Sequence, residues 1–318
     1  MKNSAAGNRW LLGTVVIALV SASAAQGAEP IADQFSVATY ASDGVDVNSR
    51  LVVFPSDRKE FSIPLPLTLR YVVYGASGQS LYATAFKKNP DARSFSTLPG
   101  LLKIELTPVR VSAIPGIDLV IDRFAVSRKE DRILFAANRS DSGRNVCGVF
   151  ELDLSDGNLR SVLQTTDCRA GFPWRVFDLS PNTPEALISA DRRLATLDLT
   201  SGKVTPLGSE LWTGSYSPDG KWIAAIELHN PRPPTTILID RQDFSRRRDL
   251  RESNDEVVWS PDSRFLLHAV YRPACPSQNP LALETLEIET GKRLTLKNSI
   301  CNTGSGRDIG WVDSKIGR

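Results

Sequence analysis

The chain has 318 residues, and its 38 lysines and arginines are almost balanced by 36 aspartates and glutamates. The formal net charge of +2 excludes a general electrostatic attraction for nucleic acid or for an anionic membrane surface. The four cysteines contain no C-x-x-C pair and only two histidines occur, so the sequence lacks the spacing of a zinc site.

The first 27 residues have the pattern of a secretory signal peptide. Lys2 and Arg9 give a positive start, residues 11–20 form a short apolar run, and small residues follow up to Gly27. The run is too short to span a bilayer comfortably, and no second apolar segment of membrane length follows. We predict cleavage near Gly27, which leaves residues 28–318 as a single periplasmic or secreted domain. The alternative is an uncleaved N-terminal anchor.

Three short strands are predicted next, at residues 35–40, 50–54 and 61–63, where apolar and β-branched residues stand between polar segments. A degenerate repeat begins after residue 67. Its clearest copies are Ser-Pro-Asp-Gly at Ser217 and Ser-Pro-Asp-Ser at Ser260, 43 residues later. Proline, aspartate and glycine in this order favour a tight turn.

Weaker copies of this turn are expected at Ser77, Ser127 and Ser180. Each turn precedes an apolar strand, and the strand at residues 222–226 is apolar without interruption. Such a run is typical of a strand that is covered on both faces.

The second half of the repeat is a hairpin with a glycine turn. Copies occur at residues 149–162, 194–207 and 283–296, and in them polar and apolar residues alternate. The alternation predicts outer strands with one solvated side. The Gly-Lys turns lack the preceding glycine of a phosphate-binding loop.

A repeat of this length is typical of a β-propeller, in which one four-stranded blade recurs around an axis. We therefore predict an all-β fold with six four-stranded blades. Residues 308–313 have the pattern of a first blade strand without a continuation. We expect them to pair with the three N-terminal strands and close the ring, which removes a free sheet edge.

The two Ser-Pro-Asp blocks and the hairpins resemble the WD40-like (PD40) propeller repeat of the TolB family, over about residues 67–313. The resemblance implies a propeller that contacts a protein partner, and its motif carries no catalytic residues. TolB also has an N-terminal α/β domain, for which there is no room between the signal peptide and the first strand here. Similar repeats occur in prolyl-oligopeptidase-like peptidases, but their hydrolase domain with its G-x-S-x-G motif is absent.

The cysteines Cys147, Cys168, Cys275 and Cys301 allow three disulfide pairings. The pairs Cys147–Cys168 and Cys275–Cys301 are favoured, because each then lies within or beside one blade. Each would contribute about 3 kcal/mol by restricting the unfolded chain.

Other polar residues have structural interpretations that we favour over catalytic ones. His268 lies in an apolar strand and is expected in the core, whereas His229 begins a loop. Asp219 and Asp262 occupy the repeated turns, so we expect them to bind backbone rather than act as acids or bases. The basic segment 246–251 is expected to be a solvated strand edge, with docking of an acidic partner as the alternative.

The candidate site is formed by loops that lead into the innermost strands, where aromatic and arginine side chains could bind a peptide, a glycan or a protein. The alternative is that these residues only pack blades and line the channel. No catalytic set, metal cluster, nucleotide motif or cofactor motif is found in the sequence. The candidate residues are Arg123, Trp174, Arg175, Trp212, Glu256 and Arg307.

The sequence thus favours an exported, monomeric, non-enzymatic binding or scaffold protein of the bacterial cell envelope. Its expected partner is a protein or peptide, with a glycan as a further option. The main alternative is a glycan lyase or hydrolase of the propeller type with its site in the channel, and a third is a structural domain of a larger complex. Histidines or carboxylates that converge in the channel would favour an enzyme, and tryptophans with arginines would favour binding.

Overall fold

The computed structural model describes most of the propeller region. The described residues are 35–41, 50–54, 61–67, 69–88, 95–141, 144–166, 168, 174–190, 193–208, 210–228, 234–250, 254–271, 280–301 and 309–313. The predicted signal peptide at residues 1–27 lies outside them.

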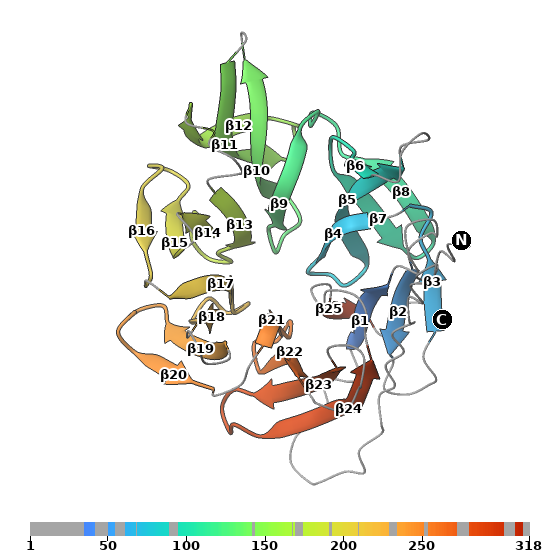
Figure 1. Ribbon diagram of the computed structural model, residues 1–318, viewed down its shortest axis with the longest axis vertical. Coiled ribbons are helices and arrows are strands. Elements are labelled where there is room, and N and C mark those ends of the chain that lie inside the picture. Colours follow the sequence, from blue (N-terminus) through green and yellow to red (C-terminus); the bar gives the residue numbers. More distant parts are fainter. Residues whose placement is uncertain are drawn as a thin grey trace, which may run out of the picture.

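Antiparallel β-sheets stand in a ring around a central axis, and each presents its innermost strand to that axis (Figure 1). Four four-stranded blades follow one another from residue 120 onward. Their strands are β9 (Val120–Val126), β10 (Arg132–Asp141), β11 (Arg144–Asp153) and β12 (Leu159–Thr165); β13 (Trp174–Leu179), β14 (Glu185–Ala190), β15 (Arg193–Asp198) and β16 (Val204–Pro206); β17 (Leu211–Tyr216), β18 (Trp222–Glu227), β19 (Thr235–Asp240) and β20 (Arg247–Asp249); and β21 (Asn254–Trp259), β22 (Phe265–Tyr271), β23 (Pro280–Glu287) and β24 (Arg293–Cys301).

A fifth four-stranded blade joins the two ends of the described chain. Strand β25 (Ile309–Asp313) pairs with β1 (Phe35–Ala41), and β2 (Arg50–Phe54) and β3 (Phe61–Pro64) complete the sheet. The register places Val37 opposite Trp311. This pairing agrees with the predicted closure of the ring by residues 308–313.

The sheet between β3 and β9 differs from the others. It contains β4 (Leu69–Tyr74), β5 (Ser80–Lys88), β6 (Phe95–Thr97), β7 (Leu102–Leu106) and β8 (Val109–Ala113). Strand β5 is long enough for its first residues to pair with β7 while its last three pair with β6. The prediction of six four-stranded blades is therefore wrong: among the described residues five blades have four strands, and this sheet has five.

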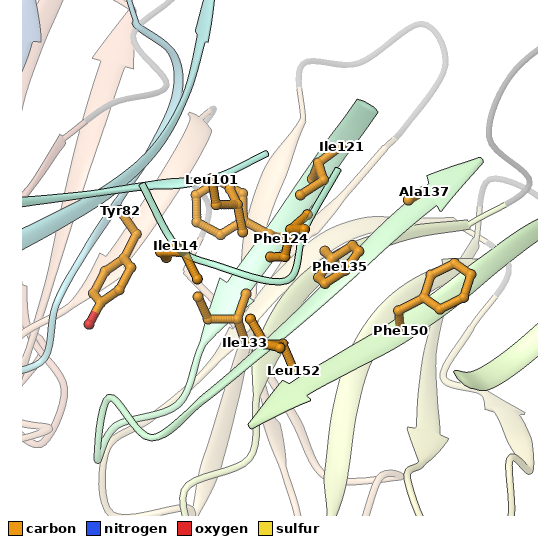
Figure 2. Close-up of a cluster of buried hydrophobic side chains, with 11 residues drawn as sticks. Tyr82, Leu101, Ile114, Ile121, Phe124, Ile133, Phe135, Ala137, Phe150 and Leu152 are labelled. Carbon is orange, nitrogen blue, oxygen red and sulfur yellow. The ribbon is translucent and has the colours of Figure 1, made fainter. Parts of the chain in front are cut away.

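The core lies between neighbouring sheets rather than inside any one of them. Central strands such as β14, β18 and β19 have four consecutive buried residues, because both of their faces are covered. Figure 2 shows one of these clusters, where Tyr82 and Leu101 meet Phe124, Phe135 and Phe150 of the next blade. A large apolar side chain contributes about 1.5–3 kcal/mol when it is buried in this way.

Candidate functional site

The repeated turns lie on one face of the propeller, and their polar side chains bind backbone. The Ser217 hydroxyl donates to Asp219 Oδ1 at 2.6 Å and accepts from the Trp222 N–H at 2.9 Å. The Ser260 hydroxyl makes the corresponding bonds with Asp262 and the Phe265 N–H. Asp219 and Asp262 accept from the Lys221 and Arg264 N–H groups, both at 3.1 Å, so both aspartates bind backbone as expected.

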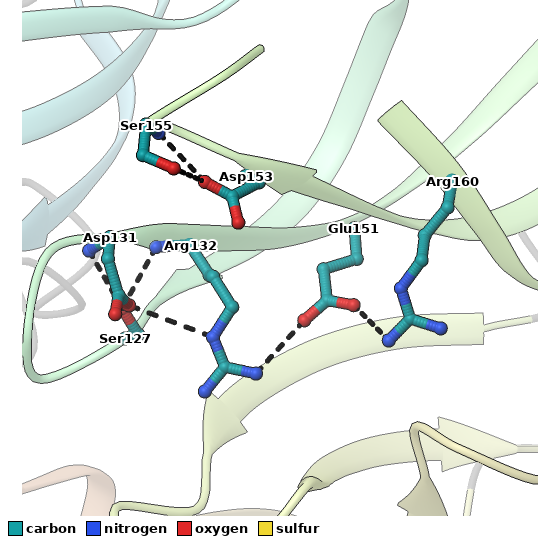
Figure 3. A network of polar contacts seen from close by, with 7 residues as sticks. All are labelled: Ser127, Asp131, Arg132, Glu151, Asp153, Ser155 and Arg160. Carbon is teal, nitrogen blue, oxygen red and sulfur yellow. Dashed lines mark hydrogen bonds and ion pairs between the residues drawn. The ribbon is translucent and has the colours of Figure 1, made fainter. Parts of the chain in front are cut away.

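Figure 3 shows a variant of this turn in the blade β9–β12. The Ser127 hydroxyl donates to Asp131 and accepts from the Arg132 N–H, although proline is missing from the turn. Arg132 and Arg160 both pair with Glu151, which is only 4% exposed. Because the positive and negative charges of this network pair with one another, we interpret it as a structural element of the blade.

The first turn of the series lies two residues before the predicted anchor. Gly75, not Ser77, donates its N–H to Ser80 O and accepts from the Gly78 N–H, as three of the anchor serines do in later blades. A Cβ on Gly75 would meet Ser80 Oγ first, and it would lie 2.7 Å from Glu130 Oε1. The Ser80 hydroxyl and the carboxylate of a neighbouring blade thus occupy the space beside Gly75.

The Glu130 carboxylate accepts four hydrogen bonds from the sheet β4–β8. The donors are the Ser77 N–H and hydroxyl, the Ser80 hydroxyl and the Tyr82 hydroxyl, at 2.7 to 3.1 Å. Burial alone would raise the pKa of Glu130, but bonds from Ser80, Ser77 and Tyr82 outweigh it and lower the pKa below its ordinary value. Glu130 therefore joins two sheets as an anion.

The basic segment 246–251 contains an exposed edge strand, as expected, and two of its arginines also contact neighbouring blades. Arg247 donates to Leu207 O at 2.8 Å and Arg248 donates to Ile288 O at 2.6 Å, so they reach the two neighbouring blades. Arg246 pairs with Asp243 within its own turn. Strand β20 is exposed, as expected, but two of its arginines connect blades.

His268 is fully buried in β22, opposite Glu284 of β23. Burial lowers the pKa of His268 to about 4, against the opposing effect of the Glu284 charge. The imidazole is neutral at pH 7, and the expectation of a core histidine is confirmed. His229 lies outside the described residues.

A disulfide joins Cys147 to Cys168, with the Cα atoms 5.6 Å apart. This pair agrees with the predicted connectivity. Cys275 lies outside the described residues, and only the backbone of Cys301 is described in β24, so the second pair stays a prediction.

A cavity of about 390 Å³ lies on the axis of the ring. Residues of β4, β9, β13, β17, β21 and β25 line it, and these are the innermost strands of their sheets. The larger and charged lining residues are Tyr74, Arg123, Arg128, Phe177, Asp178, Trp212, Trp259 and Trp311.

Arg123 lies between two aromatic rings in this cavity. Its guanidinium carbon is 5.3 Å from the ring centre of Tyr71 and 5.8 Å from that of Phe177. Such stacking uses the faces of the guanidinium and leaves its N–H donors along the edge of the plane.

Arg128 and Asp178 lie near the turn face of the same cavity. Asp178 accepts from the Leu179 and Tyr216 N–H groups, both at 2.8 Å, and Arg128 reaches Tyr216 O at 3.4 Å. Burial raises the pKa of Asp178, while the Arg128 charge and the two backbone bonds oppose the rise. Arg128 therefore extends from β9–β12 past β13 to β17, which narrows this end of the channel.

The structure brings together only part of the predicted site. Arg123 and Trp212 line the cavity, and Trp212 is 45% exposed. Trp174 packs against the core between two blades, and Arg175 is exposed at the start of β13. Glu256 lies in β21, where only its backbone is described, and Arg307 lies outside the described residues.

Sequence reasoning missed Arg128, Asp178, Trp259 and Trp311. Asp178 precedes the Leu-Ser-Pro block, and Trp259 directly precedes a Ser-Pro-Asp block, so both occupy the end of an innermost strand. The position just before a repeated turn could therefore have identified these residues. Their side chains line the cavity from the ends of the innermost strands, whereas the sequence analysis searched the loops before those strands.

Within the described ranges, no three histidine, cysteine, aspartate or glutamate side chains stand close enough to hold a metal ion. The same ranges contain no helix that is long and apolar enough to cross a membrane.

No protein-family model matches the chain, and no curated protein matches it either. Among solved structures, the chain is similar to TolB from Acinetobacter baumannii, with 15% identity, a TM-score of 0.60, and coverage of 88% of this chain and 66% of that one. A protein assigned as TolB from Agrobacterium tumefaciens has 12% identity, a TM-score of 0.58, and coverage of 88% and 98%. An oligogalacturonate lyase from Vibrio parahaemolyticus has 9% identity, a TM-score of 0.56, and coverage of 84% and 75%. At these identities the likeness shows a fold, and that fold is the β-propeller found in the TolB structures.

Proposed function

We propose that the protein is an exported, non-enzymatic β-propeller of the cell envelope that binds a protein or peptide partner at its central channel. The composition of the channel carries this proposal. Tryptophans and arginines line it, and Asp178, the one carboxylate among its described lining residues, already accepts two backbone N–H groups. Side chains of these types dominate binding energy at protein interfaces.

The enzyme alternative has less support from the same residues. Proton transfer during lyase or hydrolase chemistry requires an acid and a base within reach of one substrate. The described lining contains no histidine and offers Asp178 alone as a carboxylate. The likeness to oligogalacturonate lyases concerns the fold and assigns no reaction to this chain.

Export is proposed on two grounds. The disulfide Cys147–Cys168 belongs to a class of bond that persists in oxidising compartments. The N-terminal 27 residues have the composition of a cleaved signal.

A monomer is proposed because a single propeller that closes its own ring leaves no gap in that ring for a second copy.

The test is affinity capture from envelope extracts with three forms of the protein: wild type, Trp212→Ala and Phe244→Ala. Trp212 lines the cavity and is 45% exposed, whereas Phe244 is 37% exposed on the turn that leads into β20. We expect one partner to be recovered with wild type and with Phe244→Ala, and its recovery to fall about tenfold with Trp212→Ala.

Equal recovery with both variants, or no reproducible partner, would contradict the binding proposal. The enzyme alternative is tested in parallel by incubation with oligogalacturonate, followed by ultraviolet absorbance of an unsaturated product. If wild type turns over oligogalacturonate and Asp178→Asn does not, the enzyme alternative would replace the binding proposal.

A further inference from the structure

The hairpin of β10 and β11 projects beyond its own blade. The two strands pair with each other over their whole length, but β9 accompanies β10 only as far as Asn138, and β12 accompanies β11 only as far as Cys147. The remaining pairs, residues 139–141 with 144–146, form a two-stranded ribbon. The ribbon is about 10 Å long, and in Figure 1 the hairpin reaches farther from the ring than its neighbours.

The repeat does not explain this ribbon, because the corresponding hairpins of other blades are shorter. In β13–β16 the last described hairpin pair contains Ala190, which also pairs with the innermost strand. Glu227 does the same in β17–β20. The hairpin β22–β23 exceeds its innermost strand by one described pair. Three extra pairs are thus a property of the blade β9–β12.

A disulfide supports the base of the ribbon. Cys147 stands opposite Asn138, in the last row before the ribbon begins. Its bond to Cys168 ties this row to the chain that leaves β12, and Cys147 is completely buried. Two strands alone are only marginally stable in water, so a covalent support at the base favours an ordered ribbon.

The edge of the ribbon that continues the β9 side of β10 has no strand beside it among the described residues. Strand β9 begins at Val120, and the preceding chain bends away at Leu119, whose carbonyl accepts from the Gly100 N–H. Val120 is 44% exposed, so the described part of the chain leaves this corner open. The N–H and C=O groups along an unpaired edge can pair with another strand.

The ribbon projects on the same face of the propeller as the channel mouth beside Trp212. Strands β9 and β17 both end at a repeated turn, so their first residues lie on the opposite face. Val120 begins β9, and Trp212 is the second residue of β17, where it lines the channel. A partner bound at this mouth therefore approaches the face from which the ribbon projects.

We propose that the ribbon is a second contact site for the protein partner, where an extended segment of that partner adds as a strand beside residues 139–141. The segment runs antiparallel to β10, in line with β9 but beyond its first residue. Main-chain hydrogen bonds supply the attraction, as in other cases of strand addition. An edge of three residues binds weakly on its own, so this contact adds to the one at the channel by holding a second part of the same partner. The inference rests on the proposed binding of a protein or peptide and specifies the conformation of the bound segment.

The probe is the end-blocked pentapeptide TVTVT at millimolar concentration, because threonine and valine favour strands. A second form is N-methylated at alternate residues and keeps one bonding edge, whereas a third is methylated at every residue and keeps none. Binding is followed by the amide signals of isotopically labelled protein. We expect the signals of residues 139–141 to shift with the first two forms, and the third form to bind about tenfold more weakly.

A shortened hairpin assigns the contact to the ribbon. In this variant Asn-Gly, a preferred two-residue hairpin turn, replaces residues 139–146, so the hairpin ends level with β9 and keeps Cys147. Retention of the peptide in equilibrium dialysis should fall about tenfold, while the thermal unfolding temperature stays the same. The outer strand β8 is the internal control, since it is an exposed edge away from this face, and its signals should not shift.

Unshifted signals at residues 139–141, equal binding of all three peptide forms or equal retention by the shortened variant would overturn the inference. Shifts confined to β8 would overturn it as well. A Trp212-dependent partner that the shortened variant recovers as well as wild type does would remove this inference and leave the proposed function standing. Peptide binding at the ribbon without a Trp212-dependent partner would have the reverse meaning.

Discussion

Two serines that are two residues apart show how differently the turn face and the channel use polar groups. Ser217 is fully buried in a repeated turn, where its hydroxyl both donates and accepts a hydrogen bond. Ser215 lines the channel, and its hydroxyl has no partner among the described residues. The serine that recurs with the blades binds backbone, whereas the serine at the axis has no equivalent contact.

The largest expected effect is at Glu130, where the turn face joins two sheets. Glu130→Ala removes the acceptor for four hydrogen bonds and leaves the buried Ser80 and Tyr82 hydroxyls without it. We expect the free energy of unfolding in urea to fall by about 3 kcal/mol. Lys129→Ala, at the exposed neighbouring position, serves as the control and should be neutral.

The same site predicts a dependence on pH. Because the pKa of Glu130 is lower in the folded protein than in the unfolded chain, its ionised form stabilises the fold. This contribution is complete above the ordinary glutamate pKa of about 4.3 and is lost as the pH falls through the folded value. The difference in unfolding free energy between wild type and Glu130→Gln should be largest near neutral pH and shrink in acid. A difference that does not vary with pH would show that Glu130 is not ionised.

An intermediate loss of unfolding free energy is expected when Ser217 is replaced. Ser217→Ala leaves the Trp222 N–H without its acceptor and removes one of the donors to Asp219, at a position that is fully buried. We expect a loss of about 2 kcal/mol in urea-induced unfolding. A loss no greater than that of the exposed Ser201→Ala would mean that the repeated turn depends on proline and aspartate alone.

Arg246 and Arg247, at the start of the exposed basic segment, should contribute less to stability. Arg247→Ala removes the bond to Leu207 O and should cost about 1 kcal/mol, whereas Arg246→Ala breaks an exposed pair with Asp243 and should cost almost nothing. Thermal unfolding of the two variants side by side distinguishes a contact between blades from a surface charge. Equal shifts would contradict the distinction.

The smallest change in unfolding free energy is expected at Ser215, and the direction of that change is informative. Ser215→Ala removes a covered hydroxyl that has no partner among the described residues, so the free energy of unfolding should stay the same or rise slightly. A loss as large as that of Ser217→Ala would show that the channel serine is structural. The difference between the turn face and the channel would then disappear.

The sequence predicted the propeller well where its residues repeat. Ser217, Ser260 and their aspartates are recognisable because each turn is built from neighbouring residues in the chain, so local pattern and local contact coincide. The ends were also predictable, since β1, β2, β3 and β25 are short strands with clear boundaries. The extra strand β6 was not, because it pairs with an extension of β5 that has no equivalent in the other blades.

The site was less predictable, because it depends on which blades become neighbours. Glu130 accepts hydrogen bonds from another sheet, and Arg128 reaches a carbonyl two blades further along the chain. Neither contact leaves a pattern in the sequence near the residue itself. Trp259 and Trp311 look like ordinary strand residues until the ring places them at the axis.

The pairing of β25 with β1 also has a consequence for the order of events during synthesis. Strand β1 is made early, but the partner for its inner edge is the last strand in chain order. Until that strand arrives, β1 to β3 present an unpaired edge that can accept any other strand, including one from a second molecule. The ring therefore cannot close before β25 has been made, which leaves the inner edge of β1 open for the whole of the intervening synthesis.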